Sequence, residues 1–322
     1  MHTLLLTIEP LTAFVTPLHG DTMFGQLCWA LRNRHGDDWL RERLQGYTEN
    51  RPFLVVSDAF PAEYWPRPCL PPEFAFGQQG PENQESRKEV KARVWLPNRM
   101  WKRPLREWMD QCQTEKELWN GCARKVHPQP HNSINRLTGT TGSGDDGFAP
   151  YVVDQIWFPP ESELELWLVV DPQRLDHETL QQALEDVGRI GFGKDASTGQ
   201  GHFRVESLTE TPLPRQKHSN AWLTLGHCAP QGGGFDPERS FYLPFTRFGR
   251  HGDTLALTEN PFKKPMLLAR TGAVLTPAAG SFLDVAFVGR GLGGDGSLST
   301  VMWETVHQGY APVVGIHVAA EE

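Results

Sequence analysis

Residues 191–203 read GFGKDASTGQGHF, and the rest of the chain can be organised around this glycine-rich stretch. On its N-terminal side, Asp176 can cap a helix whose apolar residues recur at helical spacing, and Gly191 ends that helix. On its C-terminal side, HFRVESL alternates apolar Phe203 and Val205 with polar neighbours, which is typical of a strand. The stretch is therefore predicted to connect a helix to a strand.

The segments further out complete a pattern of strands around two helices. Before the helix just described, residues 164–170 (LELWLVV) predict a strand. Near the N-terminus, residues 3–9 (TLLLTIE) predict a buried strand, and residues 21–44 predict an amphipathic helix with Asp21 as its N-cap. Residues 53–56 (FLVV) predict a further strand. In order, these segments give β-α-β, an insertion and β-α-β, which is the split βαβ or ferredoxin-like pattern.

The chain length predicts two domains, because 322 residues exceed the roughly 100 to 200 of an ordinary domain. We expect an N-terminal ferredoxin-like domain at 1–212, with an insertion at about 61–160 where the apolar periodicity is lost. Residues 211–219 (TPLPRQKHS) have the composition of a linker. The C-terminal part, 213–322, is richer in strand signals. The predicted fold class is α+β, with two RRM-type, ferredoxin-like domains in tandem, the second degenerate and strand-rich.

Positive charge is concentrated in one window of an acidic chain. Residues 87–106 hold eight basic residues and one acidic, a local charge of +7, which leaves −15 for the rest of a chain of net charge −8. Trp95 and Trp101 are interleaved with these cations, as suits stacking on bases beside phosphates of single-stranded nucleic acid. A solvated basic helix or a docking patch for an acidic subunit explains the window equally well. The interleaved cations are Lys91, Arg93, Arg99, Lys102 and Arg103.

The glycine stretch superficially matches two nucleotide-binding motifs. It contains GxGxxA and most of a Walker A sequence, but the first must follow a strand and open a helix, and the second needs Ser or Thr where Asp195 stands. Both motifs therefore fail on context. Glycines still allow close approach of a ligand to the backbone, and Lys194, Ser197 and Thr198 can bind phosphate oxygens. A tight helix-to-strand connection without a ligand is the alternative.

Histidine and cysteine residues give one candidate site and no predicted metal. His19 lies in a Pro-Leu-His-Gly-Asp turn, where it could contact a phosphate, act as a general acid or base, or simply end the turn. Cys112, Cys122, His127 and His131 have the spacing C-x9-C-x4-H-x3-H, which is wrong for a structural zinc site. We therefore expect neither metal nor cofactor.

The sequence predicts a cytoplasmic protein. No apolar run approaches the length that crosses a bilayer, and the first residues, MHTLLLTIEP, lack a basic region and a cleavage site. The five cysteines form an odd set without a CxxC pair, which indicates reduced thiols.

Four stretches resemble the RAMP superfamily of CRISPR proteins. The first is the glycine stretch after the second helix of a ferredoxin-like domain. The others are TPLHGDTMFGQLCWAL at 16–31, HNSINRLTG at 131–139, and PMLLARTGAVL at 265–275 together with HQGYAPVVGI at 307–316. Within the superfamily, the combination resembles the Cas5 group, the fourth-subunit family of type III-A, Csm-type effector complexes.

The resemblance implies a non-catalytic RNA-binding subunit that caps the 5′ end of the crRNA. In that family, two ferredoxin-like domains hold the repeat-derived 5′ tag, between the large polymerase-like subunit and the first backbone RAMP subunit, and target RNA is met only indirectly. The insertion, from 87 to 136 here, would reach over the crRNA. By motif, the residues implied at the RNA are His19, Gly20, Asp21 and Thr22 in the turn beside the tag, Lys194, Ser197, Thr198, Gly191, Gly193, Gly199 and Gly201 at its backbone, and His131, Asn132 and Arg136 in the insertion.

Two enzymatic hypotheses compete with this one. Some RAMP relatives process pre-crRNA by in-line attack of a 2′-hydroxyl, and His19 could then serve as acid or base, although the sequence indicates no second group to complete the site. A nucleotide-dependent metabolic enzyme would rest on the glycine stretch alone, whose context already argues against it.

Overall fold

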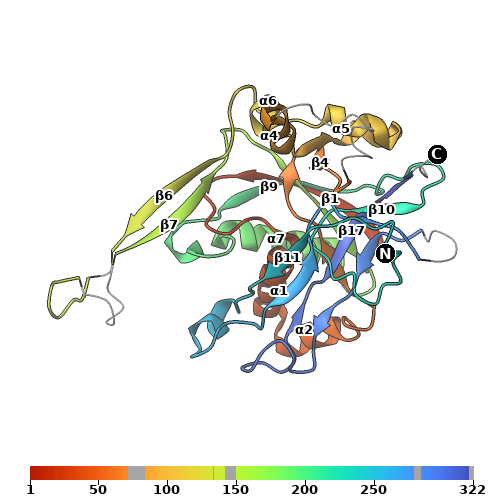
Figure 1. Cartoon of the computed structure of the whole chain (residues 1–322). Coiled ribbons are helices and arrows are strands. Elements are labelled where there is room, and N and C mark those ends of the chain that lie inside the picture. The colour runs from red at the N-terminus through yellow and green to blue at the C-terminus, as the bar shows by residue number, and fades with distance from the viewer. Residues whose placement is uncertain (72–83, 133, 142–149, 279–283, 319–322) are drawn as a thin grey trace.

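The computed structural model describes residues 1–71, 84–132, 134–141, 150–278 and 284–318 (Figure 1). Within these ranges no helix is both long and apolar enough to span a bilayer.

The N-terminal half is built on one antiparallel sheet. Its strands are β1 (His2–Pro10), β2 (Leu54–Val56), β8 (Leu164–Val170) and β9 (Phe203–Glu210), in the spatial order β2-β8-β1-β9. The short β3 (Phe60–Pro61) also pairs with β8. Two helices connect these strands, so the chain order is β-α-β-β-α-β apart from the insertion, consistent with the predicted ferredoxin-like pattern.

The second of these helices follows the predicted local signals. Helix α7 (His177–Ile190) begins after Asp176, whose carboxylate accepts the Thr179 N–H at 2.8 Å. It ends at Gly191, which adopts a positive φ of 106° that disfavours other residues. The strand predictions for 164–170 and for HFRVESL are confirmed by β8 and β9.

The first helix covers nearly the predicted residues, but it is broken in the middle and its start is stabilised by a different residue. It is split by Gly36 (φ 94°) into α1 (Gly20–His35) and α2 (Asp37–Leu44). Asp21 is not the N-cap, because it lies inside the first turn. The carboxylate that accepts a first-turn N–H, that of Gly20 at 2.8 Å, belongs to Asp58, 38 residues later. A distant residue therefore stabilises the start of this helix.

The C-terminal half contains a second antiparallel sheet with the order β13-β10-β17-β14. Its strands are β10 (Ala221–Thr224), β13 (Val274–Leu275), β14 (Phe287–Gly289) and β17 (Tyr310–Ile316), and two small ladders pair β11 (Pro244–Arg247) with β12 (Met266–Ala269) and β15 (Leu292–Gly293) with β16 (Val306–His307). No α-helix occurs within 213–278 or 284–318, where the only helical turn is a 3₁₀ turn at Asp253–Leu257. This half is strand-rich as expected, while its ferredoxin-like ancestry stays a prediction.

The two halves share one interior. Helices α1 and α7 cover one face of the first sheet, where Leu6 and Ile8 are fully buried. On the opposite face, Trp167 of β8 packs in one cluster with Leu223 and Val314 of the second sheet. Because β8 is covered on both sides, its sequence is a nearly continuous apolar run.

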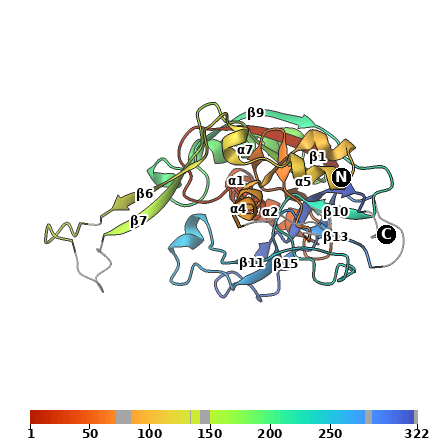
Figure 2. The same ribbon diagram turned by 45° about the horizontal axis from the view of Figure 1, so that its top comes forward.

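The insertion has more regular structure than its sequence indicates. Strands β4 (Tyr64–Pro66) and β5 (Trp95–Pro97) pair, and helices α4 (Gln84–Ala92), α5 (Trp108–Gln111) and α6 (Glu115–Leu118) surround them, with 3₁₀ turns at Asn98–Lys102 and Leu105–Glu107. Strands β6 (Lys125–His131) and β7 (Tyr151–Trp157) form a hairpin, which we call the arm. The arm projects away from the body in both views (Figures 1 and 2).

Candidate nucleic-acid interface

A cavity of about 1040 Å³, which we call the cleft, lies where the two halves and the insertion meet. Its walls include residues 16–19 and 66–70, together with Leu243 and Phe245. Four cationic side chains line it together with several aromatic rings, a composition that suits phosphates and bases. These are Arg67, Lys91, Arg124 and Arg270, with Phe14, Phe60, Trp95, Trp119, Phe158 and Phe245.

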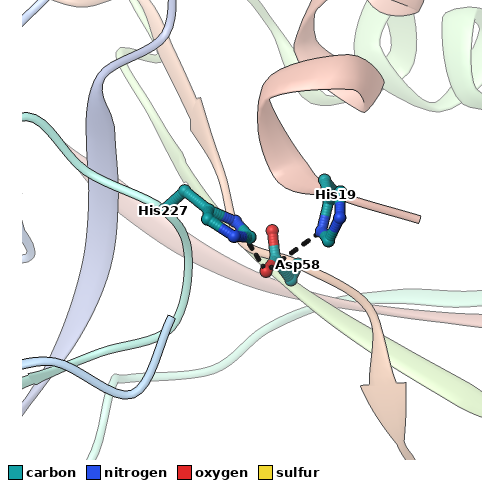
Figure 3. A group of neighbouring side chains, drawn as sticks. All are labelled: His19, Asp58 and His227. Carbon is teal, nitrogen blue, oxygen red and sulfur yellow. Dashed lines mark ion pairs between the residues drawn. The ribbon is translucent and has the colours of Figure 1, made fainter. Parts of the chain in front are cut away.

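Three polar side chains meet in the cleft wall: His19, Asp58 and His227 (Figure 3). Asp58 Oδ2 lies 3.5 Å from His19 Nδ1 and 3.1 Å from His227 Nδ1. Burial pushes the pKa of Asp58 upward, but the adjacent rings of His227 and His19 hold it well below its usual range. For His19, burial has the opposite effect and lowers the pKa, but the Asp58 carboxylate outweighs burial and raises this pKa above its ordinary value. Asp58 is therefore an ionised carboxylate between two imidazoles.

Asp58 also joins the two halves of the chain. Its Oδ1 accepts the Gly20 N–H at 2.8 Å, and its Oδ2 accepts the Thr271 hydroxyl. Its own N–H donates to the Leu225 carbonyl at 2.9 Å. Sequence reasoning did not select Asp58, His227 or Thr271. Asp58 and His227 each follow shortly after a buried strand, and Thr271 lies within the quoted PMLLARTGAVL segment, but no spacing links these positions.

The residues after His19 face the interior. A Cβ on Gly20 would lie 2.2 Å from the Val56 carbonyl oxygen, so no larger residue fits there. Asp21 is buried, and its Oδ2 forms an ion pair with Arg247 Nε at 2.7 Å and lies 3.2 Å from His307 Nε2. Although burial raises the pKa of Asp21, the contact with His307 and the charge of Arg247 lower it far below the ordinary value.

The HGDT turn therefore presents one residue to the cleft. The His19 side chain is 25% exposed and lines the cavity. The half-buried Thr22 hydroxyl accepts a hydrogen bond from Arg247. Gly20 and Asp21 are buried and do not line the cleft.

The glycine-rich loop after α7 folds against its own residues. A Cβ on Gly191 would lie 2.4 Å from Gln200 O, and one on Gly201 would lie 2.2 Å from Phe192 O. A Cβ on Gly193 would lie 2.5 Å from the side chain of Thr16, a residue of the cleft wall. These glycines satisfy tight packing within the protein. The tight-connection hypothesis thus explains three of the four candidate glycines.

The outer turn of the same loop is open. Lys194, Ser197, Thr198 and Gly199 are exposed, and a Cβ on Gly199 would meet no atom within 4 Å. The turn at Ala196–Thr198 is a short 3₁₀ helix. The Lys194 N–H donates to Thr16 Oγ1 at 2.9 Å, which fixes the loop beside the cleft.

The structure divides the basic window between two surfaces. Lys91 lines the cleft, and Arg93 pairs with Glu117 at 3.6 Å. Lys102 and Arg103 line a second hollow of about 540 Å³, which we call the basic hollow. Its other charged or titratable residues are Arg106, Lys217 and His317. Arg99 is exposed.

Trp95 and Trp101 are half-buried and pack against the buried cluster that contains Trp167, Leu223 and Val314. Trp95 also lines the cleft, and Trp101 lines the basic hollow with Lys102 Nζ 5.5 Å from its ring. Each tryptophan therefore packs partly against the protein interior and partly lines a surface hollow, the cleft for Trp95 and the basic hollow for Trp101.

The remaining candidates belong to the end of the arm. His131 stacks on Tyr151 with ring centroids 5.2 Å apart, and Asn132 and Arg136 are exposed just beyond β6. None of the three is among the residues lining the cleft. Cys112 is buried and Cys122 exposed, while His127 lies on β6 with His131.

Comparison with known proteins identifies the family. A model described as the RAMP superfamily matches residues 12–204, whereas no curated protein matches the chain. A chain of a Csm1–Csm4 cassette in complex with pppApA is similar, with a TM-score of 0.59, 16% identity and full coverage of both chains. A chain of a Csm3–Csm4 subcomplex of the type III-A interference complex has a TM-score of 0.58 and 14% identity, over 99% of this chain and 100% of the other. These likenesses show a shared fold, and because the family model spans more than half of the sequence, the chain belongs to the RAMP superfamily.

Proposed function

We propose that this chain is a non-catalytic RNA-binding subunit of a type III CRISPR effector complex, and that it holds the 5′ tag of the crRNA in the cleft. The observation that carries the proposal is the cleft itself. Both halves and the insertion contribute to it, and its lining combines cations with aromatic rings. Single-stranded RNA is bound by this combination, because cations neutralise phosphates while ring faces stack on bases.

The position of the glycine-rich loop supports the same proposal. Its exposed Lys194 and Ser197 lie on a loop anchored to Thr16 of the cleft wall. RNA leaving the cleft along this wall would place its backbone against the loop, where an ammonium group and a hydroxyl can bind phosphate oxygens. The loop would then position the backbone without reading bases.

We further propose that the chain bridges a large polymerase-like subunit to a backbone RAMP subunit in the cytoplasm. The similar solved chains come from Csm1–Csm4 and Csm3–Csm4 assemblies, which supports both contacts. Exposed apolar side chains on the C-terminal half suit a protein contact, since such groups are otherwise costly in water. They include Phe248, Phe262 and Leu267. The arm would extend over the crRNA, and this chain would contact target RNA only indirectly.

Binding of tag RNA to the full chain tests the RNA-holding role. A fluorescently labelled 5′-tag RNA should bind with an affinity that falls steeply with salt, and Lys194→Ala should weaken binding similarly for different tag sequences and reduce the salt slope by about 0.7. Lys116→Ala, which removes an exposed lysine of α6, is the matched control. Wild-type affinity and slope in Lys194→Ala would contradict the assignment.

One observation supports a second candidate, a metal-independent endoribonuclease. The structure brings His227 beside His19, with ring centroids 4.6 Å apart, and so supplies the second acid–base group that the sequence did not indicate. One imidazole would take the proton of an RNA 2′-hydroxyl as its oxygen bonds to phosphorus, and the other would protonate the departing 5′-oxygen. Repeat RNA cleaved in EDTA to a 2′,3′-cyclic phosphate, with the cleavage lost in His19→Ala and His227→Ala, would favour this candidate. Intact RNA would favour the non-catalytic role.

A further inference from the structure

The site formed by His19, Asp58 and His227 has the geometry of metal ligands. One ring nitrogen of each histidine and one carboxylate oxygen of Asp58 all lie within 4.8 Å of one another. Around a tetrahedral ion with ligands at about 2.0–2.2 Å, neighbouring ligand atoms are about 3.4 Å apart. The Asp58–His227 and Asp58–His19 separations, 3.1 and 3.5 Å, already match that spacing. The two imidazoles therefore lie on either side of one carboxylate oxygen, close enough to share an ion with it.

We propose that these three residues bind one divalent transition-metal ion of the zinc class. Two imidazole nitrogens and one carboxylate are a donor set preferred by zinc and its neighbours, whereas magnesium and calcium prefer oxygen ligands alone. Within the residues that the structure describes, no other set of three His, Cys, Asp or Glu side chains meets the same spacing. The inference does not depend on RNA binding.

The surroundings hold the donor atoms in place. The Gly20 N–H binds Asp58 Oδ1 and leaves Oδ2 turned toward the imidazoles. The Thr271 hydroxyl donates to Asp58 Oδ2, and this oxygen has a second lone pair for an ion. The same hydroxyl lies 3.2 Å from His227 Nδ1. Phe245 packs against both imidazoles, with ring centroids 4.1 Å from His227 and 5.9 Å from His19. Such outer contacts orient metal ligands in proteins.

The site has an entry path and an open side. Asp58 and His227 are buried, His19 is partly exposed, and all three line the cleft. Three protein ligands leave a tetrahedral ion with a fourth position, which would face the cleft and take a water molecule or an anionic oxygen. The ion would fix the start of α1 to the C-terminal half at the point where His19 and His227 meet.

Zinc titration of the full chain tests the proposal. After removal of metals with EDTA and exchange into chelator-free buffer, calorimetry should show one Zn²⁺ bound per chain, and a tenfold excess of Mg²⁺ should not compete. His227→Gln should weaken binding by at least 100-fold. His251→Gln, which alters another buried histidine whose Nε2 lies 2.8 Å from Ser299 Oγ, should leave the affinity unchanged.

Two further measurements keep the result decisive. Circular dichroism and the melting temperature establish that each variant is folded, and Co²⁺ bound to the unmodified chain should give the visible absorption of a tetrahedral site. If His227→Gln fails to fold, the cobalt spectrum alone decides. Absence of stoichiometric zinc, or of a tetrahedral cobalt spectrum, would overturn the proposal and leave the cluster as a polar contact between the halves. Zinc affinity unchanged in His227→Gln but lost in His131→Gln would place the ion on the arm and also overturn it.

Discussion

The side chain of Gln308 offers the sharpest test of how the two halves are joined. Its amide forms two hydrogen bonds with the backbone of Val56, accepting the N–H at 2.9 Å and donating to the carbonyl at 2.8 Å. Gln308 is 1% exposed, so both bonds are shielded from water. Val56 belongs to β2, the edge strand of the first sheet, and Gln308 supplies the pairing that a neighbouring strand would give.

Gln308→Ala should destabilise the protein strongly, because it leaves two buried backbone groups without partners. Each unsatisfied buried group costs about 1–3 kcal/mol, so the free energy of unfolding should fall by about 2–6 kcal/mol. That loss is a large fraction of the roughly 5–15 kcal/mol of a typical domain. The variant should therefore be measurably unstable even if it still folds.

Urea unfolding followed by fluorescence and circular dichroism measures this loss. The matched control is Gln231→Ala, because the Gln231 amide is exposed and makes one hydrogen bond, at 3.1 Å to the Leu267 carbonyl. Surface changes of this kind usually stay within about 0.5 kcal/mol. A Gln308→Ala value within 1 kcal/mol of the control, on the scale of one ordinary hydrogen bond, would refute the reasoning.

Three further predictions concern local packing, pH and capping. Gly20→Ala should destabilise the protein by about 1–3 kcal/mol, because the new Cβ meets a β2 carbonyl oxygen at 2.2 Å. The control, Gly25→Ala in the same helix, places a Cβ with no atom within 4 Å and should stabilise the protein by up to about 1 kcal/mol. Equal effects of the two changes in urea unfolding would contradict this reasoning. Burial lowers the pKa of His307, so folding favours its neutral form. The contribution of His307 to the free energy of unfolding should therefore be fully present above the unfolded pKa of about 6.5 and should fall as the pH drops below it. His307→Gln should flatten that part of a stability–pH curve, and an unchanged slope would count against it. Asp176→Ala should cost about 1 kcal/mol in thermal unfolding, since it removes the cap of α7, and no loss would show that the cap is dispensable.

The candidate site was only partly predictable from the sequence. His19, Lys91 and Lys194 were selected because their residue types and neighbours suit RNA, and the structure places the first two on the cleft and the third on the adjoining loop. Asp58 and His227 were missed because they are 169 positions apart and no local pattern connects them.

The arm was missed for a different reason. Pro128 and Pro130 interrupt the sequence of β6, and prolines normally argue against a strand. In the hairpin, however, β6 pairs with β7 on one side only, so a missing N–H on its other edge costs no strand hydrogen bond. The prediction of an irregular segment is therefore wrong at β6, because the sequence does not show that its prolines lie on a strand edge.

The sequence by itself determined the elements whose signals are local. The cap at Asp176, the positive φ at Gly191 and the apolar runs of β1 and β8 act over a few residues, and they fix the order of strands and helices. Only the tertiary structure decided which motifs face water. Gly20 is buried against β2, and Asp21 is buried beside Arg247 of β11 and His307 of β16, while His19 stays on the cleft. Exposure therefore depends on contacts between segments far apart in the chain.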